Sequence, residues 1–297
     1  MKDNIFQVRR YHDPTKYPQL QICRVDPAIF YSDVMIITPS PTTSPPHNIM
    51  PSLHLLVTAA VALAATIKAQ AIIDLGTALP FAVLAGEAVT NTGLTIVDGH
   101  LGVSPGTSIS GFLPGTVASP GTRHSADAVV LQAKLDLVTA YDSAARRPST
   151  PLTGVLGGRT LAAGVYSFNS SAQLTGPLTL DAQNNTQSVW IFQTGSSLIT
   201  VSYSSVRLIN GASACNVFWQ IGSSATLGTN SVFAGSILAL KSITASTGAT
   251  VNGGLYARNG AVTLDNNGVG RRACAAPTAE TGTPSTVARL PRRRAWM

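Results

Sequence analysis

The chain has 297 residues, enough for one or two domains with a substantial buried core. Only 11% of the residues are charged, against roughly 25% in an average globular protein. With 44% hydrophobic residues, this composition excludes a disordered chain or a coiled coil, and three cysteines are too few for a disulfide scaffold. The composition indicates a β-rich, uncharged, secreted protein.

The formal net charge of +7 lies entirely in the two ends of the chain. Residues 72–270 contain eight basic and eight acidic residues, whereas residues 1–71 carry +2 and residues 271–297 carry +5. A nucleic-acid-binding protein would carry clustered Lys and Arg on its folded body. We therefore expect no nucleic-acid partner, and the basic cluster at 292–294 belongs to a flexible tail, 271–297.

The first 71 residues divide into two segments. Residues 1–49 show no sustained periodicity and end in a Pro/Thr/Ser linker, so we interpret them as an extension that is disordered or absent from the mature protein. Residues 50–71 contain an apolar run, Leu53–Ile67, that is too short to span a bilayer and precedes a small-x-small sequence, Ala-Gln-Ala. We expect 50–71 to be a signal peptide and the mature protein to be extracellular, without a membrane span. A signal anchor or a buried helix is the alternative.

The cysteines and two sequons bear on a secreted form. Removal of the signal peptide would leave Cys215 and Cys274, which could be oxidised outside the cell, but their spacing does not show whether they pair. The sequons at Asn169 and Asn184 are candidate glycosylation sites.

One long helix is predicted over residues 125–147, a stretch without Gly or Pro. Ser125 is the expected N-cap, and Pro148 ends the helix. The rest of residues 75–270 consists of short β-prone runs broken by Gly, Ser and Asn. The apolar residues of the helix fall on one stripe at helical spacing: Val130, Ala133, Leu137, Val138, Tyr141 and Ala145.

The β-prone runs repeat. Residues 192–197 recur 27 residues later as 219–224, and Ser224-Ala225-Thr226 recurs 18 residues later as Ser242-Ile243-Thr244. Imperfect repeats of this length are typical of a β-solenoid, in which each coil contributes about three strands that pair in parallel with the next coil, ~4.8 Å away. The runs 189–192 and 217–219 are apolar at successive positions, so we expect the helix to pack on them.

No catalytic or metal-binding pattern is recognisable. The chain lacks HExxH, CxxC, P-loop and GxSxG motifs. Lyases and hydrolases built on β-solenoids need clustered carboxylates, whereas Asp181 and Asp265 are isolated. We interpret His100 as a turn residue and His124 as part of the helix entry. The sequence predicts that the protein is not an enzyme, with a solenoid lyase as the remaining alternative.

The repeat instead predicts a flat, uncharged face. If Leu227 and Ala245 point inward, the residues beside them point outward at equivalent positions of successive coils. Small Thr, Ser, Ala and Gly side chains on a rigid lattice can hold water in a regular array, whereas charged groups impose their own order on it. Thr and Ser are also ordinary outward residues of strands, so both interpretations stay open at this point. We expect Thr229 and Thr247 to stack at the corner that follows the strand. The predicted strip consists of Ile199, Ser202, Thr226, Gly228, Thr229, Thr244, Ser246 and Thr247.

A series of segments matches one known family in order and without large gaps: 75–112 (with Asp98-Gly99-His100-Leu101-Gly102-Val103), Ala126-Asp127-Ala128, 161–168, 171–182, 216–228, 248–253 and 261–266. Through these segments the chain resembles, over residues 72–270, the microbial β-solenoid ice-binding, or antifreeze, protein family. The resemblance implies a discontinuous right-handed parallel β-helix of triangular section, with one long helix alongside and the N-terminal coils at one end. It also implies secretion, no metal, no cofactor, and adsorption to ice through one flat face.

We therefore predict a secreted, monomeric, non-enzymatic protein that binds ice through the strip and inhibits ice growth and recrystallisation. The run Thr244-Ala245-Ser246-Thr247 fits the Thr-Ala/Gly-x-Thr pattern of some members of the family, whereas Ile199 and the basic tail depart from it. The alternative from another class is a cell-surface adhesin that binds glycan through the same face.

Overall fold

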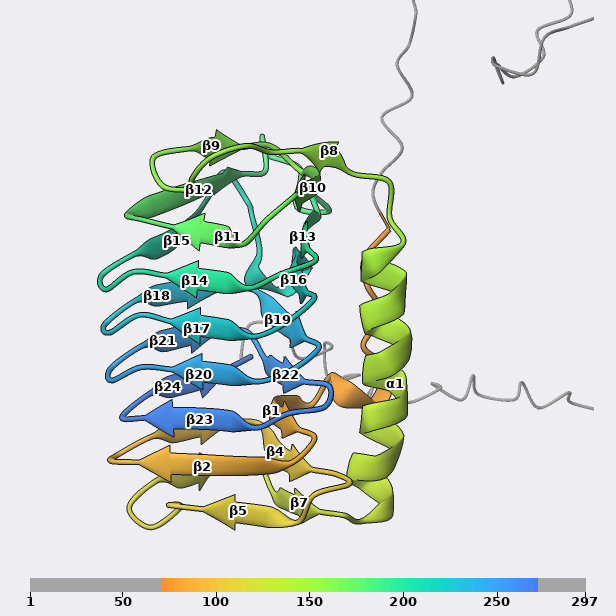
Figure 1. The fold of residues 1–297 in the computed structure, drawn as a ribbon, viewed down its shortest axis with the longest axis vertical. Coiled ribbons are helices and arrows are strands. Elements are labelled where there is room, and N and C mark those ends of the chain that lie inside the picture. The colour runs from red at the N-terminus through yellow and green to blue at the C-terminus, as the bar shows by residue number, and fades with distance from the viewer. Residues whose placement is uncertain (1–70, 272–297) are drawn as a thin grey trace, which may run out of the picture. The chain divides into compact units, whose positions relative to one another are not determined.

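The computed structural model describes residues 71–271. The predicted extension, all but the last residue of the predicted signal peptide, and the tail from residue 272 lie outside the described residues. The described chain winds into a stack of coils whose strands form three parallel sheets, with one long helix running beside the stack (Figure 1). The predicted β-solenoid with a single helix alongside is confirmed.

The three sheets, called A, B and C here, are the three sides of the stack. In stacking order, sheet A contains β7 (Arg123–Ser125), β4 (His100–Val103), β1 (Phe81–Ala85), β22 (Leu255–Ala257), β19 (Ser236–Ala239), β16 (Val217–Ile221), β13 (Trp190–Thr194), β10 (Gly164–Phe168) and β8 (Thr150–Pro151). Sheet B contains β11 (Ala172–Leu174), β14 (Leu198–Thr200), β17 (Ala225–Leu227), β20 (Ile243–Ala245), β23 (Val262–Asp265), β2 (Ala88–Thr92) and β5 (Ser108–Ser110). Sheet C contains β6 (Thr116–Ala118), β3 (Ile96–Asp98), β24 (Gly268–Gly270), β21 (Thr250–Asn252), β18 (Val232–Ala234), β15 (Ser205–Ile209), β12 (Pro177–Asp181) and β9 (Thr160–Leu161).

The order of the coils in space differs from their order in the chain (Figure 1). Strands β1 to β7 build one end of the stack, α1 (Ala128–Ala145) carries the chain along sheet A to the other end, and the later coils return toward the start. The last coil therefore pairs with the first one, β22 with β1 and β23 with β2. The predicted discontinuity, with the N-terminal coils at one end, is confirmed.

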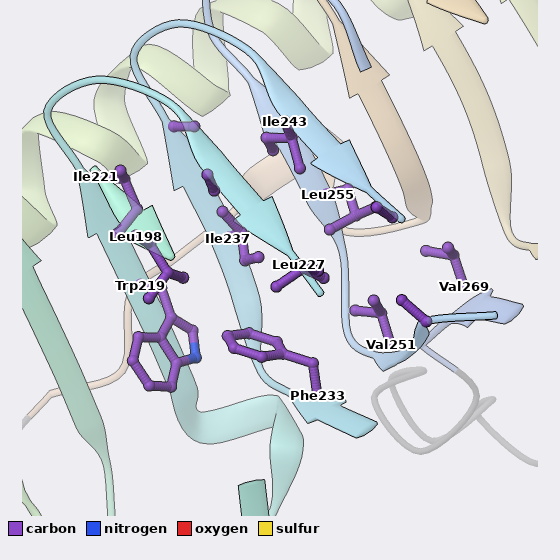
Figure 2. Close-up of a cluster of buried hydrophobic side chains, with 14 of the residues drawn as sticks. Leu198, Trp219, Ile221, Leu227, Phe233, Ile237, Ile243, Val251, Leu255 and Val269 are labelled. Carbon is purple, nitrogen blue, oxygen red and sulfur yellow. The ribbon is translucent and has the colours of Figure 1, made fainter. Parts of the chain in front are cut away.

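Both sequence repeats correspond to strand pairing. Phe192 lies opposite Trp219 in sheet A, and Ala225 lies opposite Ile243 in sheet B. The Phe192 and Trp219 rings stack with centroids 4.1 Å apart, and the Trp219 Nε1–H donates to the Ala234 carbonyl. Figure 2 shows these coils contributing Trp219, Leu227 and Phe233 to the interior of the stack.

Sheet A is apolar on both faces, as expected for the runs 189–192 and 217–219. Trp190 and Phe192 belong to the cluster inside the stack, whereas Ile191 and Phe218 belong to a second cluster under the helix. The inner strands of sheet A therefore bury one face in the solenoid and the other against α1, whereas both residues of the end strand β8 are exposed.

The helix is shorter than predicted, at both ends. Asp127, not Ser125, is its N-cap, because the Asp127 carboxylate accepts the Val130 N–H while Ser125 ends β7 and donates to the Thr107 carbonyl. Ala145 is exposed, and the buried side chain of the last turn is Ala144.

The prediction missed Lys134, which is buried because its ammonium group donates to the Ala257 and Arg258 carbonyls and ties the helix to sheet A. Burial, followed by the nearby Arg258 charge, lowers the pKa of Lys134 to about 8.

Two short 3-10 helices complete the described elements. They are η1 (Gly76–Ala78), which packs against α1, and η2 (Ala214–Asn216), which precedes β16.

Candidate functional site

The outer surface of sheet B is an ordered array of small side chains. In β11, β14, β17, β20 and β23 the residues on either side of the central position point inward and are buried, as Leu227 and Ile243 do in Figure 2. In β2 and β5, Asn91 and Ile109 are half-buried. The central residues point outward and align in register from coil to coil. We call this set the central row: Gln173, Ile199, Thr226, Thr244, Thr263, Thr90 and Ser110.

Two further rows flank the central row, because outward residues recur at every second position of a strand. The rows are about 6.6 Å apart along the strands, and neighbouring members of one row are ~4.8 Å apart. The preceding row is Ser171, Ser197, Ser224, Ser242, Ala261, Ala88 and Ser108. The following row is Thr175, Val201, Gly228, Ser246, Asp265 and Thr92.

Asp265 is the single ionisable side chain in these three rows. Its carboxylate accepts a hydrogen bond from the Thr247 hydroxyl, so the charge is directed toward the corner between sheets B and C. The remaining members are hydroxyl, amide, aliphatic or glycine residues, so the outer surface of sheet B is almost free of charge.

Buried polar contacts hold this surface in place. The Asn267 side chain is buried at the corner, where its amide donates to the Ser246 and Ala249 carbonyls and its oxygen accepts the Asp265 N–H. Fully paired buried groups of this kind fix the backbone, because breaking them would leave polar atoms without partners.

The structure places the eight residues of the predicted strip at two different locations. Ile199, Thr226 and Thr244 lie in the central row, and Gly228 and Ser246 lie in the following row. The other three, Ser202, Thr229 and Thr247, lie in the turns that lead from sheet B to sheet C. Five of the eight therefore share the outer surface of sheet B, and three line its edge.

The sequence interpretation missed four members of the central row: Gln173, Thr263, Thr90 and Ser110. A signal existed for two of them, because Val89-Thr90 and Val262-Thr263 share a Val-Thr pair with an inward valine. The 18-residue offset did not reveal the pair, because Thr90 and Thr263 come from the two ends of the described chain.

A hydrogen-bonded cluster that contains two histidines lies on sheet A, at the end of the sheet that β4 and β7 form. His100 begins β4 and His124 lies in β7, so the expectation that His100 is a turn residue is wrong. The Thr122 hydroxyl lies 2.7 Å from His100 Nδ1 and 2.7 Å from His124 Nε2, and His124 Nδ1 lies 2.8 Å from the Asp127 carboxylate. The cluster connects two strands to the start of the helix.

Neither a metal centre nor a membrane helix is found in residues 71–271. The described His, Cys, Asp and Glu side chains form no group of three that could hold a metal ion. Within the same residues, no helix combines the length and the apolar character needed to cross a membrane.

Comparison with known proteins defines the class to which this solenoid belongs. The family model described as Ice-binding-like matches residues 83–270. The chain belongs to this family.

Relatives with known sequences support the assignment. The ice-binding protein of Nostoc sp. (strain HG1) is 53% identical over 205 residues, which cover 68% of this chain and 75% of the relative. The ice-binding protein of Flavobacterium frigoris (strain PS1) is 32% identical over 212 residues, which cover 67% of this chain and 76% of the relative.

Solved structures agree with the fold. The crystal structure of an ice-binding protein from an Antarctic biological consortium matches with a TM-score of 0.66 and 46% identity, covering 67% of this chain and 91% of that one. The ice-binding protein of the Antarctic ascomycete Antarctomyces psychrotrophicus matches with a TM-score of 0.65 and 44% identity, covering 67% and 98%. The predicted family and fold are confirmed.

Proposed function

We propose that this chain binds ice through the outer surface of sheet B, and that adsorption there inhibits ice growth and recrystallisation. The relatives and the solved structures it resembles are ice-binding proteins. The observation that carries the choice of surface is the register of the central row, where Thr226, Thr244, Thr263 and Thr90 occupy consecutive strands.

Such a surface suits ordered water for physical reasons. Methyl groups exclude liquid water without competing for its hydrogen bonds, and hydroxyl groups spaced by the strand lattice can join a regular hydrogen-bonded layer. Because the sheet is already rigid, little conformational entropy is lost when that layer forms. An array of flexible or ionised side chains would lack both advantages.

The other parts of the proposal follow from the same surface. Adsorption to ice needs no catalytic group, cofactor or metal, so we expect the protein to act without them. We also expect it to act as a monomer. A protein that acts on ice crystals would meet them outside the cell, which agrees with the predicted signal peptide at 50–71.

An ice-affinity experiment separates this function from the adhesin alternative. When an ice hemisphere grows slowly in a dilute solution, the protein should be enriched in the ice, while an inert globular protein of similar size is excluded. Exclusion from the ice together with saturable binding to polysaccharide in liquid buffer would support the adhesin instead.

A further inference from the structure

The corner between sheets B and C repeats the same tight turn in three successive coils. The fourth residue donates its N–H to the first one's carbonyl in the turns 201–204, 228–231 and 246–249, at 3.2, 3.1 and 3.1 Å. The third residue of each turn has a positive φ, 61° for Tyr203, 53° for Asn230 and 71° for Gly248. Each of these third residues also donates its backbone N–H to a carbonyl of the next coil along sheet B: Tyr203 to Thr229, Asn230 to Thr247 and Gly248 to Asp265. The three positions are therefore equivalent.

Tyr203 does not suit this position. A turn with positive φ at its third residue is normally occupied by Gly or Asn, because other side chains crowd the backbone there. The equivalent corner positions of the following coils obey this rule: they hold Asn230, Gly248, Asn266 and Gly93, all at positive φ. A bulky residue held in such a conformation is a reason to look for a function.

The coil that carries Tyr203 is also unusually apolar on the outside. Ile199, Val201 and Tyr203 are 42%, 44% and 74% exposed. At the equivalent positions, the next coil has Thr226, Gly228 and Asn230, and the one after it has Thr244, Ser246 and Gly248. This coil thus exposes three apolar side chains within five residues where the following coils have small or polar ones, and a gathering of exposed apolar residues commonly marks a binding surface.

We propose that Tyr203, together with Ile199 and Val201, forms an apolar section of the ice-binding surface and contacts ice directly. This inference rests on the proposed function of sheet B. Ile199 belongs to the central row and Val201 to the following row, so the section continues the hydroxyl-bearing surface to its edge. An aromatic side chain there enlarges the area from which liquid water is excluded, and its rigidity limits the entropy lost on contact.

The test replaces Tyr203 by the residue that its turn prefers. Tyr203→Asn reproduces the corner of Asn230 and Asn266, so it should fold normally, with a Tm unchanged or raised by about 2–4 °C as strain is relieved. Thermal hysteresis and recrystallisation inhibition should nevertheless fall at least about twofold, because an aromatic contact is lost. The matched control is Leu135→Gln, which removes a side chain that is 56% exposed on the helix beside sheet A. This control should leave activity unchanged.

A second variant, Thr226→Tyr, distinguishes failure of this inference from failure of the proposed function. If Thr226→Tyr abolishes ice binding and Tyr203→Asn does not reduce it, the role of Tyr203 is refuted and the sheet B surface stands. If neither change reduces binding, both are refuted. Loss of polysaccharide binding in Tyr203→Asn with unchanged thermal hysteresis would assign the tyrosine to a glycan and refute the ice contact.

Discussion

Thr90 and Thr263 lie side by side on sheet B, with their Oγ1 atoms 3.3 Å apart, although 173 residues separate them in the chain. Their contact closes the seam where the last coil meets the first, so that the central row runs on across the seam from Thr263 to Thr90.

Replacing either threonine by Tyr should put a bulky group in the middle of the surface. We expect thermal hysteresis to fall at least about fivefold, as for a blocked central contact, while the free energy of unfolding changes by less than about 0.5 kcal/mol. Full activity in Thr90→Tyr, with folding verified by circular dichroism, would show that the surface stops before the N-terminal coils.

The carboxylate of Asp265 is expected to oppose ice binding. It is the one ionisable side chain in the three outward rows, and it accepts a hydrogen bond from the Thr247 hydroxyl. Asp265→Asn removes the charge and keeps the size, so thermal hysteresis should rise. The free energy of unfolding should fall by about 0.5–1.5 kcal/mol, because a charge-assisted hydrogen bond is weakened. Thr247→Val loses the same hydrogen bond but keeps the charge, and should not raise activity. A fall in the hysteresis of Asp265→Asn would mean that the carboxylate takes part in binding.

The histidine cluster predicts that the fold loses stability in mild acid. Burial, followed by the charge of His124, lowers the pKa of His100. His100 Nδ1 accepts the Thr122 N–H, so protonation at this nitrogen would break that bond. The unfolded chain, with an ordinary pKa near 6.5, binds a proton at a higher pH than the folded one. The contribution of His100 to stability is therefore complete above about pH 6.5 and is lost as the pH falls below it. Thermal melts of the wild type and His100→Gln as a function of pH measure this effect. Equal pH dependence of the two proteins would contradict it.

The disulfide of Cys215 is expected to join it to Cys274. Cys215, in η2, is disulfide-bonded, and its partner lies outside the described residues. Cys274 follows only three residues after Arg271, whose guanidinium is anchored near sheet A by Ser236 and Tyr256. Non-reducing peptide mapping of the secreted protein should recover a 215–274 crosslink. Cys274→Ser should lower the free energy of unfolding by about 2–4 kcal/mol. A crosslink from Cys215 to Cys23 would instead mean that the N-terminal residues are retained.

The sequence was informative where the relevant contacts are local. The repeats at 27 and 18 residues correspond to strand pairing, because consecutive coils place equivalent side chains on top of one another. The stretch without Gly or Pro before Pro148 likewise located the helix. Its start was misplaced by two residues because Ser125 and Asp127 are both good N-caps, and only the pairing of β7 with β4 decides between them.

The sequence could not supply the contacts across the seam. Which coil follows which in space depends on the path of the chain along α1, so nothing local links Thr90 to Thr263. The repeat did place Thr229 and Thr247 at the corner that follows the strand, and the structure has both of them in the turns 228–231 and 246–249.

The most direct test of the account compares two threonines on neighbouring sides of the stack, the central residue of β17 and the first residue of β21. Thr226 lies on sheet B and Thr250 on sheet C, and both are exposed strand residues. Thermal hysteresis should be abolished by Thr226→Tyr and retained by Thr250→Tyr, with similar Tm values for the two proteins. The reverse pattern, or equal activity in both variants, would contradict ice binding through sheet B.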